Sequence, residues 1–124
     1  MNSTIEKFQL KNKVALVTGA SQDLGFDACC ALAEAGASVA ITSRALQNAQ
    51  DAAEKLSTRF GTDAIGLELD HTKWNDVQRV KQKMLDWNGR VDILINNAGG
   101  GSGLGETNLF KRDPEAITAL VESN

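Results

Sequence analysis

Short apolar runs of strand length alternate along this chain with longer segments in which apolar residues recur every three or four positions. The runs predict β-strands over residues 13–19, 38–44, 63–70 and 91–99. The segments after them predict α-helices over residues 24–37, 45–61, 72–89 and 113–124. Strand and helix therefore alternate throughout, with one glycine-rich interruption over residues 99–105 that we interpret as a loop.

In two of the predicted helices, an apolar stripe indicates the face that packs on the core. In a third, the sequence indicates where the helix begins. The stripe in the helix over 45–61 consists of Ala45, Ala49, Ala52, Ala53 and Leu56. The stripe in the helix over 72–89 consists of Trp74, Val77, Val80, Met84 and either Leu85 or Trp87. The last predicted helix opens with Asp113 as its N-cap and Pro114 in its first position.

The alternation predicts a single α/β domain over residues 1–124. The alternation favours a parallel sheet covered by helices on both sides, because parallel strands need crossovers and right-handed crossovers place successive helices on one face. We therefore predict a doubly wound parallel sheet of the Rossmann type, in the strand order 3-2-1-4 and incomplete at its C-terminal side. In that order the strand over 91–99 would form an apolar edge, so we expect the chain on its own to associate.

Composition and charge remove several classes of partner. A net charge of −3 with scattered basic residues argues against nucleic acid. The apolar runs are too short to cross a membrane and the first residues are polar, so we expect a soluble cytoplasmic protein. Cys29 and Cys30 adjoin in a predicted helix, which favours a role as core residues, and with only one histidine we expect no metal site.

The stretch LVTGASQDLG, residues 16–25, joins the first predicted strand to the first predicted helix. Gly19 can form a sharp turn there, and Gly25 can let the helix approach the strand closely. In a doubly wound fold this turn lies beyond the carboxyl end of its strand, and the helix start presents N–H groups and a positive dipole end. The stretch therefore predicts a site for a diphosphate.

The same stretch, together with NNAG at residues 96–99, resembles the short-chain dehydrogenase/reductase family from about Lys11 to the end of the chain. It matches that family's T-G-x-x-x-G-x-G pattern except at Asp23. The resemblance implies that the backbone around Ser21, Gln22 and Leu24 lies near the phosphates of a dinucleotide. It also implies that Asn97, Ala98 and Gly99 lie beside the nicotinamide ribose, that Asp70 accepts a hydrogen bond from the adenine amine, and that the backbone of His71 lies next to it.

The end of the second predicted strand bears on which cofactor binds. An acidic residue there would hold both ribose hydroxyls of NAD(H), whereas a cation can pair with the 2′-phosphate of NADP(H). This chain has Ser43 and Arg44, a hydroxyl and a guanidinium group that suit a phosphate. We therefore favour NADP(H) over NAD(H).

Asp23 stands where the family has glycine. A carboxylate at this place would repel a diphosphate, and aspartate is a good helix cap that could occupy the anion site with its own side chain. We hypothesise that Asp23 caps the helix and weakens cofactor binding.

The family's reaction needs a tyrosine with a lysine three or four residues later, and this chain has no tyrosine. Asn124 lies where the family carries a catalytic asparagine. The resemblance therefore implies the cofactor-binding segment of an oxidoreductase, truncated before the catalytic tyrosine and lysine and inactive alone. We expect the complete enzyme to act on a small carbonyl compound or alcohol and to form a homo-oligomer. The alternative is a non-catalytic nucleotide-binding or scaffold protein with a degenerate cofactor turn.

Overall fold

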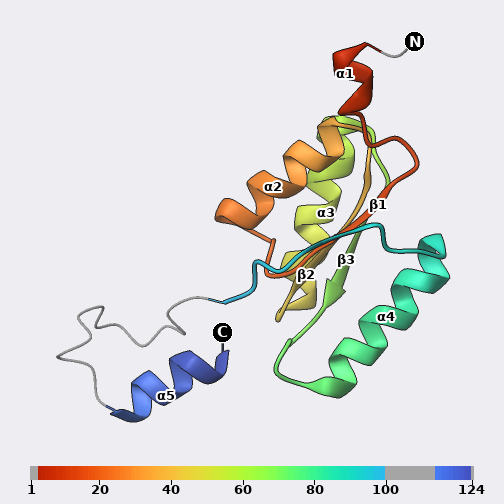
Figure 1. The fold of residues 1–124 in the computed structure, drawn as a ribbon. Coiled ribbons are helices and arrows are strands. Elements are labelled where there is room, and N and C mark those ends of the chain that lie inside the picture. The colour runs from red at the N-terminus through yellow and green to blue at the C-terminus, as the bar shows by residue number, and fades with distance from the viewer. Residues whose placement is uncertain (1–2, 100–113, 124) are drawn as a thin grey trace.

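The computed structural model describes residues 3–99 and 114–123, and its centre is a parallel sheet (Figure 1). The strands are β1 (Val14–Val17), β2 (Ser38–Ser43), β3 (Ala64–Glu68) and β4 (Ile93–Ile95). They pair in the order β3-β2-β1-β4, all parallel. This confirms the predicted fold class and strand order.

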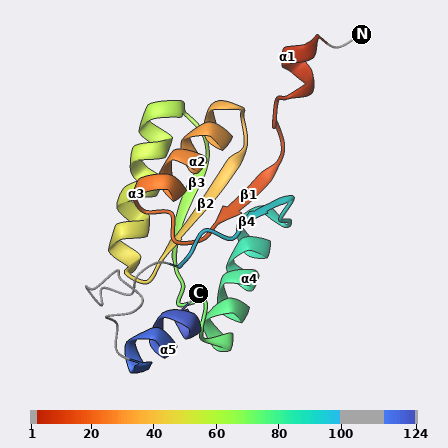
Figure 2. The same cartoon turned by 60° about the vertical axis from the view of Figure 1, so that its left-hand side comes forward.

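Helices cover both faces of the sheet. The helices are α1 (Thr4–Lys7), α2 (Asp23–Glu34), α3 (Leu46–Phe60), α4 (Trp74–Asn88) and α5 (Pro114–Ser123). Two views show α2 and α3 together on one face and α4 on the other (Figures 1 and 2). The doubly wound arrangement follows, because the crossovers β1–α2–β2 and β2–α3–β3 run toward one side and β3–α4–β4 returns on the opposite side.

Alternate residues of β2 divide the core into two layers. Val39 and Ile41 are fully buried in the cluster beneath α2 and α3, which also contains Cys29. Ala40, between them, belongs to the cluster beneath α4. Opposite facing of successive side chains is the geometry of a strand, and burial on both sides explains the continuous apolar sequence. Burial also raises the pKa of the Cys29 thiol to about 12, which agrees with its prediction as a core residue.

The set of α4 residues that pack on the core differs from the prediction. Trp74 is 70% exposed and Leu85 is also exposed, whereas Trp87 packs on the cluster beneath α4. At 100° per residue, Trp74 and Leu85 lie roughly 100° or more from the centre of the stripe that Val77, Val80, Met84 and Trp87 form. The inward assignment of Trp74 was therefore wrong, and of the two alternatives Trp87 is correct.

Ala45 is exposed for a different reason: it is the N-cap of α3, with extended backbone angles, and so precedes the helical stripe. The short helix α1 was not predicted, although Ser3 and Glu6 form a capping box there. Asp113 lies outside the described residues, so its role as a cap stays a prediction. None of the helices in the described part of the chain is long and apolar enough to cross a membrane.

Candidate cofactor site at the ends of the strands

Gly19 and Gly25 shape the turn between β1 and α2 by leaving room for the segment that follows β4. Gly19 has φ +59°, and a Cβ on it would lie 2.8 Å from the Cα of Ala98. A Cβ on Gly25 would lie 2.4 Å from Nδ2 of Asn97 and 2.9 Å from the Cα of Ala20. Both positions therefore need glycine for space, and Gly19 also needs it for its backbone conformation.

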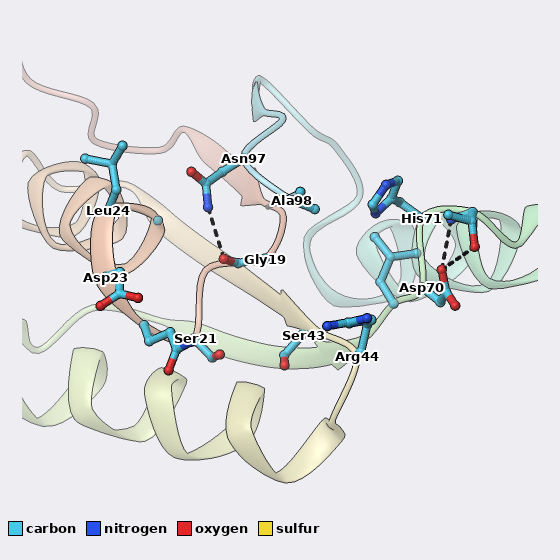
Figure 3. Close-up of a pocket in the computed structure, with 15 residues that line it drawn as sticks. Gly19, Ser21, Asp23, Leu24, Ser43, Arg44, Asp70, His71, Asn97 and Ala98 are labelled. Carbon is cyan, nitrogen blue, oxygen red and sulfur yellow. Dashed lines mark hydrogen bonds between the residues drawn. The ribbon is translucent and has the colours of Figure 1, made fainter. Parts of the chain in front are cut away.

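Hydrogen bonds join this turn to the segment after β4. The Oγ1 atom of Thr18 accepts from the backbone N–H groups of Asn97 and Ala98, each at 3.0 Å. The side-chain amide of Asn97 donates to the carbonyl oxygen of Gly19 at 3.0 Å (Figure 3). The two loops that the sequence patterns TG and NNAG define are thus held as one unit.

A second threonine joins the turn to β2. The backbone N–H of Gly19 donates to Oγ1 of Thr42 at 3.3 Å, and that of Ala20 donates to the carbonyl oxygen of Thr42 at 3.0 Å. Thr18 and Thr42 are the buried polar residues of the core in the described part of the chain. Neither threonine was predicted to make these contacts, although a threonine at the carboxyl end of a mainly apolar run is a usable signal for such a contact.

Asp23 does not cap α2 as hypothesised. The N-cap is Gln22, in an extended conformation and without a side-chain cap, and Asp23 follows it with φ +55°. Within the described residues the exposed carboxylate of Asp23 has no hydrogen-bond or ion-pair partner. The left-handed backbone explains why the family pattern has glycine here, since a side chain is disfavoured in that conformation.

The predicted residues come together around one cavity of about 600 Å³ beyond the carboxyl ends of the strands. All thirteen predicted cofactor-binding residues line it: Gly19, Ser21, Gln22, Asp23, Leu24, Gly25, Ser43, Arg44, Asp70, His71, Asn97, Ala98 and Gly99. Leu69 and Thr72 also line it and were not predicted. Asn124, the predicted catalytic residue, lies outside the described residues.

The charged groups stand on different sides of this cavity. Figure 3 shows Asp23 at the start of α2 on one side and Arg44 with Asp70 and His71 on the other. Arg44 is exposed and has no ion-pair partner among the described residues. Ser43 accepts a hydrogen bond from the backbone N–H of Ala45 at 3.3 Å, so its own hydroxyl proton stays available to a ligand.

Asp70 is held in place at the end of β3. Its Oδ1 atom accepts from the hydroxyl of Thr72 at 2.6 Å and from the backbone N–H of Thr72 at 3.0 Å. These bonds, the hydroxyl bond above all, hold the pKa of Asp70 below its usual value. The side chain is thus an ionised acceptor at neutral pH, with Oδ2 unused by other described residues.

Comparisons with known proteins agree with this geometry. Residues 13–124 match the family model described as short chain dehydrogenase. The chain is 37% identical over 100 residues to a peroxisomal 2,4-dienoyl-CoA reductase of Arabidopsis thaliana, covering 81% of this chain and 33% of the relative. It is 36% identical over 101 residues to an NADP-dependent mannitol dehydrogenase of Hypocrea jecorina, covering 79% and 38%.

A solved structure extends the likeness to three dimensions. The crystal structure of L-sorbose reductase from Gluconobacter frateurii, complexed with NADPH and L-sorbose, has a TM-score of 0.76 and 25% identity. The match covers 94% of this chain and 46% of that one. The chain spans 33% and 38% of the length of the two curated relatives. By its sequence match and its fold, this chain belongs to the short-chain dehydrogenase family of oxidoreductases.

Proposed function

We propose that this chain is the dinucleotide-binding part of an NADP(H)-dependent short-chain oxidoreductase. The observation that carries the proposal is the cavity at the carboxyl ends of the parallel strands, which is lined by every residue that the sequence assigns to the cofactor. Doubly wound folds bind their ligands at such a place. The NADP-dependent relative and the NADPH-bound relative support this choice of ligand.

The start of α2 would hold the diphosphate. The N–H groups in the first turn of a helix have no acceptor within that helix, and the positive end of its dipole favours an anion. The missing side chains at Gly19 and Gly25 let the backbone come close to a ligand. Asp23 is the one member of this cradle that does not fit an anion, because its exposed carboxylate stands at the same helix start.

The opposite side of the cavity would hold the adenosine. Arg44 offers a guanidinium fork without a partner in the described residues, and Ser43 offers a hydroxyl proton beside it. Both groups suit a 2′-phosphate, which is the difference between NADP(H) and NAD(H). Asp70, with a free carboxylate oxygen, would accept from the adenine amine.

The nicotinamide ring of the bound cofactor supplies the hydride in this chemistry. The residues of this chain bind and orient the cofactor, and Asn97, Ala98 and Gly99 line the end of the cavity beyond β4. The chain has no tyrosine, and we propose that the proton-transferring tyrosine and lysine lie in a further part of a longer protein. We propose a small carbonyl compound or secondary alcohol as substrate, and a cytoplasmic homo-oligomer as the complete enzyme.

Titration of the chain with NADPH tests the binding function. We expect saturable one-to-one binding by calorimetry or by enhanced NADPH fluorescence, and weaker binding of NADH. ATP at the same concentrations distinguishes a general nucleotide site from a dinucleotide site. An absence of NADPH binding up to millimolar concentration, with the chain folded by circular dichroism, would contradict the proposal.

A second candidate function is a non-catalytic nucleotide-binding or scaffold protein, and Asp23 is the observation that favours it. A left-handed residue with a negative side chain is unfavourable at an anion cradle for conformation and for charge. The gene sequence beyond residue 124 separates the two candidates. A Tyr-x-x-x-Lys segment there favours the enzyme, and its absence favours the scaffold.

A further inference from the structure

The turn between β3 and α4 is closed by Asp70 itself. Its carbonyl oxygen accepts from the backbone N–H of Lys73 at 3.0 Å, and its Oδ1 accepts both bonds from Thr72. These contacts fix the side chain relative to its own turn. They do not fix the turn relative to the rest of the protein.

Asp76 and Arg79, in the first and second turns of α4, make that second connection. Oδ2 of Asp76 accepts from the partly buried backbone N–H of Asp70 at 3.0 Å. Oδ1 of Asp76 accepts from Nη1 of Arg79 at 3.0 Å, and Nη2 of Arg79 donates to the carbonyl oxygen of Glu68 at 2.9 Å. One carboxylate and one guanidinium group therefore tie the start of α4 to the backbone at the end of β3.

We infer that Asp76 is a positioning residue for adenine recognition, acting through the backbone of Asp70 with Arg79 as its support. Asp76 is not among the residues that line the cavity, so it would not touch the ligand. The inference rests on the proposed function, because it concerns how the free Oδ2 of Asp70 is aimed at the adenine amine.

The physical reason is that, among the described residues, the Asp70 N–H has one acceptor, the Asp76 carboxylate. Without the Asp76 carboxylate this partly buried donor has no acceptor. A movement of the turn that exposes the N–H to water then lowers the free energy of the protein. Such a movement carries the Asp70 carboxylate with it. A misplacement of about 1 Å is enough to lose most of a directional hydrogen bond.

The experiment compares NADPH with its hypoxanthine analogue, in which an acceptor oxygen replaces the adenine amine. The wild-type chain should bind NADPH about tenfold more tightly than the analogue, the size expected for one hydrogen bond to a charged acceptor. Asp70→Ala should bring the ratio of the two dissociation constants, analogue over NADPH, close to one. Asp76→Ala should do the same although Asp70 is still present, and Arg79→Met should lower the ratio in part.

Asp86→Ala is the matched control, because Asp86 is an exposed acid on the same helix whose carboxylate, within the part of the chain that the structure describes, accepts from Gln82 alone. It should leave the ratio unchanged. Hydrogen exchange at the Asp70 amide, measured without ligand, should be at least about tenfold faster in Asp76→Ala than in wild type. Melting curves confirm that each variant is folded.

The outcomes separate the inference from the proposed function. A wild-type chain that does not bind NADPH contradicts the proposed function, and the exchange rate at Asp70 still tests the role of Asp76. A ratio that collapses in Asp70→Ala but is unchanged in Asp76→Ala overturns the inference and leaves the proposed function standing. A ratio that Asp86→Ala lowers as much as Asp76→Ala also overturns it.

Discussion

The side chain of Asn97 occupies the space that a side chain on Gly25 would need: a Cβ on Gly25 would lie 2.4 Å from the side-chain nitrogen of Asn97. That nitrogen donates to the carbonyl oxygen of Gly19 at 3.0 Å. The glycine of the helix start and the amide from beyond β4 are therefore one arrangement. The resemblance to the family rested on these two motifs as separate stretches of sequence, and the structure shows them in contact.

We predict that Gly25→Ala weakens NADPH binding at least about tenfold and lowers the free energy of unfolding by about 1–3 kcal/mol, as overpacking does. Gly25 is buried and has no left-handed backbone, so the change tests space alone. Gly61→Ala is the control: Gly61 has φ +66° with nothing within 4 Å of its Cβ position, so it tests backbone strain alone. Calorimetry and urea unfolding give the two quantities. Equal effects of both substitutions on NADPH binding would contradict the close-contact explanation.

Two substitutions distinguish the effect of the charge of Asp23 on cofactor binding from the effect of its backbone conformation. Asp23→Asn keeps a side chain that tolerates φ +55° but removes the charge, and Asp23→Gly removes both obstacles. We predict that Asn tightens NADPH binding severalfold, about 0.5–1 kcal/mol for an exposed charge, and that Gly tightens it further. Asp27→Asn, an exposed acid one turn later in α2, should change little. The gain in Asp23→Asn should shrink in high salt, and a gain independent of salt would point away from charge.

Arg44 is predicted to select the phosphorylated cofactor. Arg44→Ala should weaken NADPH binding by about tenfold or more and leave NADH binding nearly unchanged, because only NADPH carries the 2′-phosphate. Arg59→Ala is the matched control, since that guanidinium group lies 5.0 Å from the ring centre of Phe60 at the other end of α3. Fluorescence titration with both cofactors measures the selectivity. Equal losses for NADPH and NADH would mean that Arg44 does not meet the 2′-phosphate.

Asp92 connects stability to pH. It accepts from Arg90 and, at 2.8 Å, from the backbone N–H of Val14, and these bonds hold its pKa below its usual value. A carboxyl group with a lower pKa in the folded state stabilises the fold above its unfolded pKa of about 3.9, and this contribution is lost as pH falls through the folded pKa. Asp92→Asn should therefore be less stable than wild type in urea at pH 7, and the difference should narrow toward pH 2. Arg90→Met should lower the free energy of unfolding at pH 7 by less than Asp92→Asn does, since the hydrogen bond from Val14 to Asp92 remains. A gap between Asp92→Asn and wild type that is constant from pH 7 to pH 2 would contradict this account.

The strands were predictable from the sequence because they depend on residue type and periodicity. The strand order is the one expected of a Rossmann-type sheet, and most of the cavity lining was expected from the resemblance to the family. Burial on both faces explains the apolar sequence of β1 and of Val39–Ile41 in β2, and the motif residues lie where parallel strands end. The role of Asp23 as a cap was wrong because residue type favours capping, whereas the backbone angle at that position is set by the turn as a whole. The tie from Asp76 to the Asp70 N–H was out of reach for the same reason: it depends on how a turn closes between β3 and α4.

The edge of the sheet gives the last prediction. β4 pairs with β1 on one side and, within the described residues, has no strand on the other, and Leu94 is 56% exposed there. An apolar edge strand is a template for association, and a charged residue on it opposes pairing. We predict that the chain sediments as dimers or larger species at micromolar concentration and that Leu94→Lys shifts it toward monomer. Leu46→Lys replaces an exposed apolar residue in the first position of α3 and should leave the oligomeric state unchanged. Wild-type chain that stays monomeric at high concentration, or equal effects of the two lysines, would show that this edge does not drive association.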